Sequence, residues 1–373
     1  MNASKYRETL PASWFYDADH YRQELAAIWT SDWLCIGREE DWPEVGDFRR
    51  LHMAGERILV TRAGDGALHA FHNTCRHRGA VLCEAESGRF SSGRIVCPYH
   101  AWTYALSGDL ERAPRSTPAD GLRLEDFPLY RVALDTWRGF VFVNLAAEPR
   151  HSLRETLGDE AENVAAWPLE DVRRVHQTTH TLACNWKIFW ENYLECYHCP
   201  GVHPELCRLV PVYRSGFMEY ADAGQQPPDP QRPGAMLRPG AVTWSTDGST
   251  DLPWLEGLGT VDAERGMTFA TFAPTLFLVA HVDYVRTVRV LPLAPEQTEL
   301  TVDWYVHRDV LGHPALDVEQ LTAFASQVVS EDARVCELNQ QGIRCSRHQR
   351  GVLLEVEDYV HEFEQWVRQR LGQ

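Results

Sequence analysis

The sequence predicts an α+β protein in which a small all-β unit precedes a larger unit with an antiparallel sheet flanked by helices. Residues 40–148 consist of short strand-like runs separated by turns, and residues 298–307 alternate strictly between apolar and polar side chains. Helical periodicity appears in three further stretches: 185–199, 316–340 and 353–371. We therefore expect the following division of the chain: an N-terminal helical segment that packs with the second unit (1–39), the β unit (40–148) and the second unit (149–373).

Three stretches in the first half of the chain carry clear local signals. Residues 18–32 predict an amphipathic helix, because four apolar side chains share one face: Tyr21, Leu25, Ile28 and Trp29. Residues 57–71 predict a hairpin with Asp65-Gly66 as its turn. The apolar run 137–145 predicts a buried strand.

The second half mixes helices, a long loop and strands. Pro200-Gly201 is expected to end the helix predicted at 185–199. Residues 221–257 are rich in Pro, Gly, Asp and Gln and predict a long surface loop. In the strand predicted at 298–307, the apolar face consists of Leu300, Val302, Trp304 and Val306.

Composition excludes some classes of protein. The net charge of −17 argues against binding to nucleic acid, which needs a basic surface. The N-terminus lacks the apolar core of a signal peptide, and no apolar run is long enough to cross a membrane. The ten cysteines are therefore expected to be reduced thiols in a bacterial cytoplasm, available as metal ligands.

A first group of ligand-type residues lies in the β unit. Cys75-x-His77 is followed by Cys97-x-x-His100, so each of two segments carries one Cys and one His. Zinc sites usually pair Cys with Cys and His with His. Two mixed pairs suit a [2Fe–2S] centre in which one iron takes both thiolates and the other takes both imidazoles. A structural zinc site or four unrelated core residues are the alternatives.

A second group lies beside the Pro-Gly break. His198 and His203 could meet if the turn folds back, and two imidazoles with one carboxylate leave positions open on Fe(II) for oxygen and substrate. Among Glu331, Asp332 and Glu337, we select Asp332, because its neighbours one turn away on a helix are largely apolar. The alternative is a buried Asp that only makes local hydrogen bonds.

Glu195 precedes His198 by three residues, which would place both on one helix face. It is either a solvated helix carboxylate or a group that orients His198 and touches a second metal centre.

The segments CRHRG…CPYHAW, ENYLECYHCPGVH and EDARVCE together resemble the oxygenase (alpha) component of Rieske non-haem iron oxygenases. The resemblance implies an all-β Rieske domain and a helix-grip catalytic domain. Cys75 and Cys97 would bind one cluster iron, and His77 and His100 the other. The mononuclear iron would be bound by His198, His203 and Asp332. Asn192 matches a family Asn near that iron.

The resemblance also implies partners. Such proteins are usually homotrimers, in which the carboxylate at Glu195 links His100 of one chain to His198 of the next. Electrons would come from NAD(P)H through a separate flavin or ferredoxin-type reductase, since the chain shows no Gly-x-Gly-x-x-Gly fingerprint of its own.

Within the family, ENYLECYHCP is similar to the branch that monooxygenates small quaternary amines such as carnitine, glycine betaine and stachydrine. Aromatic walls could hold the ammonium group by cation–π attraction, although ordinary core is the better interpretation of each residue taken singly. The possible walls are Trp244, Trp254, Phe272, Phe277 and Trp304. Hydroxylation of an aromatic ring or aromatic acid is the alternative activity. A Rieske electron carrier and a zinc-stabilised binding module are the alternatives outside oxygenase chemistry.

Overall fold

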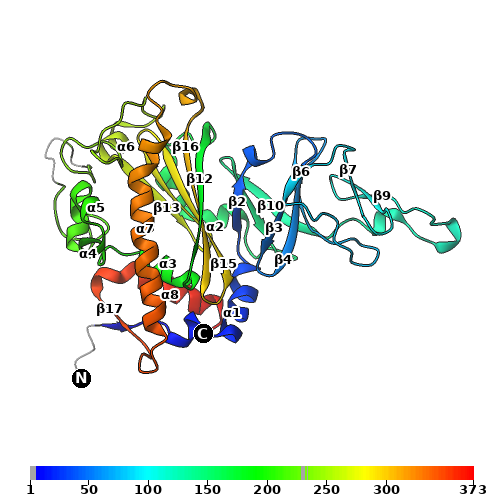
Figure 1. Ribbon diagram of the computed structural model, residues 1–373, viewed down its shortest axis with the longest axis horizontal. Helices are drawn as coiled ribbons and strands as arrows, with labels where there is room; N and C mark the ends of the chain where they lie inside the picture. Colours follow the sequence, from blue (N-terminus) through cyan, green and yellow to red (C-terminus); the bar gives the residue numbers. More distant parts are fainter. Residues whose placement is uncertain (1–5, 228–231, 233) are drawn as a thin grey trace. The chain divides into compact units, whose positions relative to one another are not determined.

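The computed structural model describes residues 6–227, 232 and 234–373. Residues 1–5 of the predicted N-terminal segment and residues 228–231 and 233 of the predicted loop lie outside the described residues. The chain forms two compact units, one made of Trp29–Thr156 and the other of the chain up to Ile28 together with Leu157–Gln373 (Figure 1). The predicted α+β class is confirmed.

The unit Trp29–Thr156 is built from antiparallel strands. Its seven-stranded sheet has the order β2-β11-β10-β5-β4-β3-β6, and a three-stranded sheet has the order β7-β8-β9. The bounds are β2 Leu34–Arg38, β3 Asp47–Met53, β4 Glu56–Arg62, β5 Leu68–His72, β6 Ser87–Arg89, β7 Arg94–Val96, β8 Thr103–Ala105, β9 Leu110–Arg112, β10 Arg131–Trp137 and β11 Phe140–Asn144.

Turn chemistry sets the register of this unit. Gly66 has φ of 84° in the loop between β4 and β5, and the Asp65 carboxylate accepts the Ala67 N–H at 2.9 Å, so the predicted hairpin is confirmed. Arg138 and Gly139 both have positive φ between β10 and β11, as a tight hairpin turn requires. The buried strand predicted at 137–145 is shorter in the structure, because Trp137 ends β10 and the turn follows it; all five residues of β11 are buried.

The other unit contains a five-stranded antiparallel sheet in the order β12-β16-β15-β14-β13. Helix α7 (Val318–Ile343) runs along this sheet and contacts α3 and β12 (Figure 1). The strand bounds are β12 Val172–Leu182, β13 Met267–Phe272, β14 Leu276–His281, β15 Val285–Ala294 and β16 Gln297–His307. The predicted apolar face of β16 is confirmed, because Leu300, Val302, Trp304 and Val306 are all buried.

Two predicted helices end or begin elsewhere than expected. The helix predicted at 18–32 is α1 (Ala18–Glu24), followed by a wider helical turn at Leu25–Trp29. The helix predicted from 353 is α8 (Asp358–Arg370), because Val352–Leu353 form strand β17 and pair with β1 (Arg7–Glu8). The remaining helices are α2 (Leu153–Leu157), α3 (Trp186–Tyr193), α4 (Cys199–Val202), α5 (Pro204–Leu209) and α6 (Thr260–Arg265).

The prediction of one helix from 185 to 199 is wrong. Helix α3 stops at Tyr193, and Pro200 lies in the first turn of the separate helix α4. Proline is tolerated there because the N–H that it lacks would have no partner inside the helix. Pro-Gly therefore belongs to a new helical turn instead of ending the old helix.

The predicted surface loop is only partly on the surface. Its described residues contain no helix or strand between 221 and 257, but Ala235, Leu237 and Ala241 are fully buried. The loop therefore contributes to the core, which its Pro and Gly content conceals. Among the described residues, no helix combines the length and hydropathy that a membrane crossing requires.

A buried ion pair fixes α3 to the N-terminal segment of the same unit. Lys187 on α3 contacts the Glu24 carboxylate, which also accepts the indole N–H of Trp186 at 2.8 Å. Burial alone would raise the pKa of Glu24, but Lys187 and these hydrogen bonds hold it below its usual value. Breaking such a pair costs about 3–5 kcal/mol, so the segment around Glu24 helps to hold α3 in place.

Candidate metal centres

Two loops of the unit Trp29–Thr156 have the same backbone construction. The N–H of Gly79 donates to the Cys75 carbonyl, and the N–H of Ala101 donates to the Cys97 carbonyl. Each cysteine N–H in turn donates across its loop, to the carbonyl of Ala80 or Trp102. Gly79 and Ala101 both have positive φ, of 76° and 58°. Each loop therefore curls around its own cysteine.

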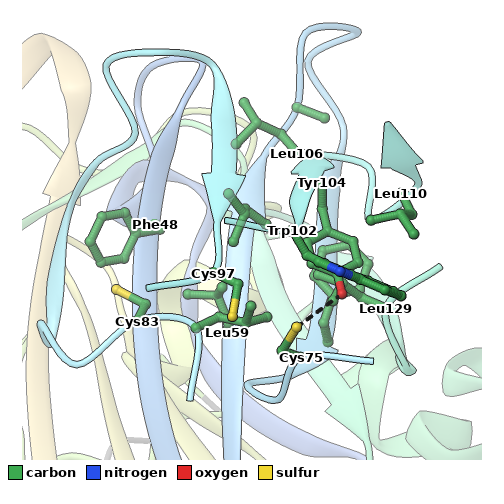
Figure 2. Packing of buried hydrophobic residues seen from close by; sticks show 14 of the residues in the cluster. Phe48, Leu59, Cys75, Cys83, Cys97, Trp102, Tyr104, Leu106, Leu110 and Leu129 are labelled. Carbon is green, nitrogen blue, oxygen red and sulfur yellow. Dashed lines mark hydrogen bonds between the residues drawn. The ribbon is translucent and has the colours of Figure 1, made fainter. Parts of the chain in front are cut away.

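The two loops bring the four predicted cluster residues together. Cys75 and Cys97 are buried at 2% and 3% exposure and interact through their side chains (Figure 2). The Nδ1 atoms of His77 and His100 lie 3.2 Å apart, and His77 stacks on Trp102. Cys83 packs in the same core, and its thiol lies near the Ala85 carbonyl, in keeping with a structural role.

The chemistry of this donor set fits a [2Fe–2S] cluster. Burial raises the pKa of the Cys75 thiol, and the nearby Cys97 thiol raises it further, so two thiolates need a cation between them. Burial and the charges of His77 and Arg78 lower the pKa of His100, which favours the neutral imidazole that binds a metal. The Tyr104 hydroxyl lies 3.3 Å from the Cys75 sulfur, a contact that sequence reasoning missed (Figure 2).

The three residues of the second predicted group lie together in the other unit. His198, His203 and Asp332 each offer a ligand atom within 4.8 Å of the others. His203 Nε2 lies 2.8 Å and His198 Nε2 lies 3.4 Å from the same Asp332 oxygen. The one-turn helix α4 closes this arrangement, because the His203 N–H donates to the Cys199 carbonyl. Asp332 faces inward from α7, as its apolar neighbours predict.

The Nδ1–H group of each histidine also donates a hydrogen bond to a carboxylate. His198 Nδ1 donates to Glu195 at 2.5 Å, and His203 Nδ1 donates to Glu331 at 2.7 Å. This leaves both Nε2 atoms directed at the shared point beside Asp332. Carboxylate partners of this kind fix the tautomer and the orientation of metal-binding histidines.

Glu195 is not on a helix with His198, because α3 has already ended. Its carboxylate instead accepts the His198 backbone N–H at 3.1 Å, which stabilises the turn between α3 and α4. Asn192, near the end of α3, places its amide nitrogen 3.4 Å from His198 Nε2.

Sequence reasoning missed the contact that Glu331 makes. It considered Glu331 only as an alternative iron ligand, whereas the structure places its carboxylate on the outer nitrogen of His203 and holds it with Gln327 at 2.9 Å. The sequence signal for this contact is that Glu331 directly precedes Asp332, since carboxylates at neighbouring helix positions can contact the two nitrogens of one histidine ring.

Nearby carboxylates raise the pKa of both histidines. Burial lowers the pKa of His198, but Asp332 and Glu195 outweigh it and raise the pKa to about 9. The pKa of His203 is likewise raised, against burial, by Asp332 and Glu331. The carboxylates around both rings therefore favour positive charge at this position, which a metal ion would also supply.

The expectation that all cysteines are reduced thiols is wrong for one pair. Cys196 and Cys199, on either side of His198, form a disulfide with a Cα–Cα distance of 4.8 Å. The turn after α3 brings them within the range that a disulfide spans. Among the described residues, the other eight cysteines form no disulfide, and Cys345 is the exposed one of these.

A cavity of about 80 Å³ opens beside His198, His203 and Asp332. Its walls are mainly apolar, and the aromatic side chains among them are Phe189, Tyr193, Tyr213, Trp244, Phe269 and Phe277. Trp244 and Phe277, two of the five possible walls, line this cavity. Trp254, Phe272 and Trp304 do not line it, and Trp254 is 47% exposed. Phe272 and Trp304 are core residues.

Comparison with known families covers most of the chain. Residues 32–131 match the Rieske [2Fe-2S] domain. Residues 169–373, more than half of the chain, match the catalytic domain of ring hydroxylating alpha subunits. The chain belongs to the ring-hydroxylating alpha subunits. This Rieske oxygenase subunit is therefore an oxidoreductase with a [2Fe–2S] domain and a catalytic domain of the mononuclear iron type, as the sequence predicts.

Relatives extend along nearly all of the Rieske oxygenase chain. It is 30% identical over 384 residues to the glycine betaine monooxygenase oxygenase subunit of Chromohalobacter salexigens, covering 96% of this chain and 84% of that protein. It is 28% identical over 369 residues to the chloroplastic choline monooxygenase of Spinacia oleracea, covering 97% and 78%. The resemblance to the quaternary-amine branch is confirmed by these relatives.

Solved structures share the fold. The quaternary ammonium Rieske monooxygenase CntA in complex with L-carnitine has a TM-score of 0.72 at 22% identity, covering 98% of this chain and 96% of that one. Naphthalene 1,2-dioxygenase from Rhodococcus sp. has a TM-score of 0.69 at 20% identity, covering 98% and 95%. Both the mono- and the dioxygenase thus share this architecture.

Proposed function

We propose that this Rieske oxygenase hydroxylates a carbon next to the nitrogen of a small quaternary amine. The product is a hemiaminal, which breaks into an aldehyde and a tertiary amine. The observation that carries the proposal is the convergence of His198, His203 and Asp332 within 4.8 Å at a cavity with aromatic walls. Relatives named for glycine betaine and choline support this substrate class.

In this proposal, His198, His203 and Asp332 hold Fe(II), and Cys75, Cys97, His77 and His100 hold the cluster. When bound, the iron activates O2 and the cluster supplies single electrons. The chain's own residues orient these groups: Glu195 and Glu331 fix the tautomers of the two histidines, and Asn192 borders His198.

The cavity walls bind and position the substrate. The rings of Tyr193 and Phe277 stack with centroids 3.7 Å apart, and the Tyr193 hydroxyl is held by Thr271 at 3.2 Å. Aromatic faces attract a methylated ammonium group by about 0.5–2 kcal/mol per contact. Val328 and Val329 on α7 add apolar surface that excludes water beside Asp332.

We further propose that electrons come from NAD(P)H through a separate flavin or ferredoxin-type reductase in a bacterial cytoplasm. We expect a homotrimer in which Glu195 links His198 of its own chain to His100 of a neighbouring chain. The contact of Glu195 with His198 Nδ1 supports the first half of this bridge.

An oxygen-uptake screen with a surrogate reductase tests the substrate class. We expect O2 consumption and stoichiometric aldehyde release with quaternary amines, and neither in the His198→Ala variant. Uptake with aromatic acids alone, yielding a ring-hydroxylated product, would replace the proposed reaction by the alternative one.

Mixing two inactive variants tests transfer between subunits. Cys97→Ser lacks a cluster ligand and Asp332→Ala lacks an iron ligand, so each homotrimer is expected to be inactive. Co-expressed chains should regain activity, because some trimers place an intact cluster beside a neighbour's intact iron site. Absence of any recovery in verified mixed trimers would contradict the inter-subunit route. In Glu195→Gln, both centres should stay loaded while single-turnover electron transfer slows.

A further inference from the structure

The cavity contains one cation that the proposed iron chemistry does not use. Arg286 on β15 lines the cavity beside the aromatic walls and is only 5% exposed. Its Nε atom is buried without a hydrogen-bond partner. Within residues 6–227, 232 and 234–373, no carboxylate lies within 4.0 Å of its guanidinium.

The acidic side chains of the cavity are already occupied. Asp332 contacts both His198 and His203, and Glu195 contacts His198. Glu331, which does not line the cavity, is held by His203 and Gln327. The charge of Asp332 acts on Arg286 only from a distance, and Fe(II) would draw on that charge as well. Arg286 therefore lacks a local counter-charge.

The sheet holds Arg286 in a defined position. Phe269 on β13, Val279 on β14 and Arg286 on β15 are directly opposite one another in register, and all three line the cavity. The guanidinium carbon lies 5.7 Å from the centre of the Trp244 ring, a stacking distance that orients its planar group.

A buried guanidinium without a counter-charge is costly, because arginine stays charged at any pH that a protein meets. The ligand that best matches its planar fork of donors is a carboxylate, which it can bind through two parallel hydrogen bonds. A guanidinium in a cavity wall can therefore act as a specificity element for carboxylates.

We propose that Arg286 binds the carboxylate of the substrate, and that the substrate is therefore a zwitterion with a quaternary ammonium group at one end and a carboxylate at the other. This rests on the proposed function for the ammonium end. The aromatic rings near His198 and His203 take the methylated nitrogen, and Arg286 takes the acid. A purely cationic amine such as choline meets an unpaired positive charge instead.

Glycine betaine and choline form a matched pair for the test, because they differ only in carrying a carboxylate or an alcohol. Binding is measured by calorimetry and turnover by aldehyde release, in the wild type and in Arg286→Gln. We expect the wild type to prefer glycine betaine. In Arg286→Gln, affinity and kcat/KM for glycine betaine should fall roughly 30-fold or more, while those for choline stay unchanged or rise.

Two further variants guard against a trivial loss of function. Arg286→Lys keeps the charge but not the fork and should retain part of the preference. Arg289 lies on the same strand but outside the cavity, where it pairs with Asp303 at 3.2 Å. The control variant Arg289→Lys should therefore leave the preference for glycine betaine unchanged. Iron content and the cluster spectrum are measured in every variant.

The outcomes separate the two proposals. Equal losses for glycine betaine and choline in Arg286→Gln, or no loss for either, would overturn the carboxylate role of Arg286. Binding of benzoate but not glycine betaine, with benzoate binding lost in Arg286→Gln, would support the anion site while overturning the quaternary-amine function.

Discussion

The two candidate metal centres are assembled over very different distances in the sequence. In the unit Trp29–Thr156, the predicted cluster residues lie between Cys75 and His100, on two loops that each close on their own cysteine. In the other unit, called here the catalytic unit (the chain up to Ile28 with Leu157–Gln373), His203 contacts Asp332 across 129 positions of the chain. The first site depends on local loop geometry, whereas the second depends on how α7 packs on the sheet. The two sites should therefore respond differently to substitution.

The largest expected effect comes from the long-range ligand. Asp332→Ala removes the carboxylate that both histidines face, so we expect the mononuclear iron and turnover to be lost while the cluster absorption remains. Iron analysis with a visible spectrum measures this, and Glu319→Ala, at an exposed position of the same helix, serves as the control. Loss of the cluster signal as well would show that the centres are not independent.

The reciprocal change removes a local ligand. Cys97→Ser should abolish the cluster absorption, because Cys97 is buried beside Cys75 and no other free thiol belongs to the two loops. We expect the catalytic unit to keep its Fe(II). Loss of Fe(II) from the catalytic unit in this variant would contradict the expectation that the two sites bind their metals independently.

A smaller effect is expected from the carboxylate behind His203. Glu331→Gln weakens the hydrogen bond that orients the ring, and changes of this kind typically cost about 10–100-fold in metal affinity. Anaerobic Fe(II) titration of the iron-free protein gives the affinity. A loss no greater than that of the matched variant Glu319→Gln would rule out an orienting role.

The last expected effect is a dependence of Fe(II) affinity on pH at the catalytic site. The pKa of His198 in the iron-free protein is about 9, above its ordinary 6.5, so the stabilisation from its carboxylate contacts is complete below pH 6.5 and is lost as the pH rises through 9. Iron needs the neutral ring, so Fe(II) affinity should rise from pH 6.5 to 9 with release of protons. Titrations at three pH values measure this, and a constant affinity would contradict it.

The difference between contacts that are local in the sequence and contacts that span long separations also explains what the sequence could predict. The four cluster residues and the hairpin turn at Asp65-Gly66 depend on a few neighbouring residues, so their spacing carries the information. Asp332 was selected because its helical neighbours are apolar, but the position of Glu331 depends on contact with a distant ring. Spacing alone also concealed that α3 ends at Tyr193, because the hydrogen bond from His198 to Glu195 competes with the helix.

Arg286 and the aromatic walls show a different limit. Phe277, Val279 and Arg286 become neighbours through the pairing of β14 with β15, and the register of that pairing is not visible in composition or periodicity. Trp304 has the strand pattern of a wall residue, yet it packs in the core.

Helix α7 carries Val328 and Val329 on the cavity wall together with Glu331 and Asp332 at the histidines. Enlarging the cavity for a bulkier molecule at Val328 or Val329 therefore alters the same helix that contacts the histidines. A shift of α7 would weaken the contacts of Glu331 and Asp332 with His203 together. Remodelling from Phe269 on β13 reaches the same hollow without disturbing them.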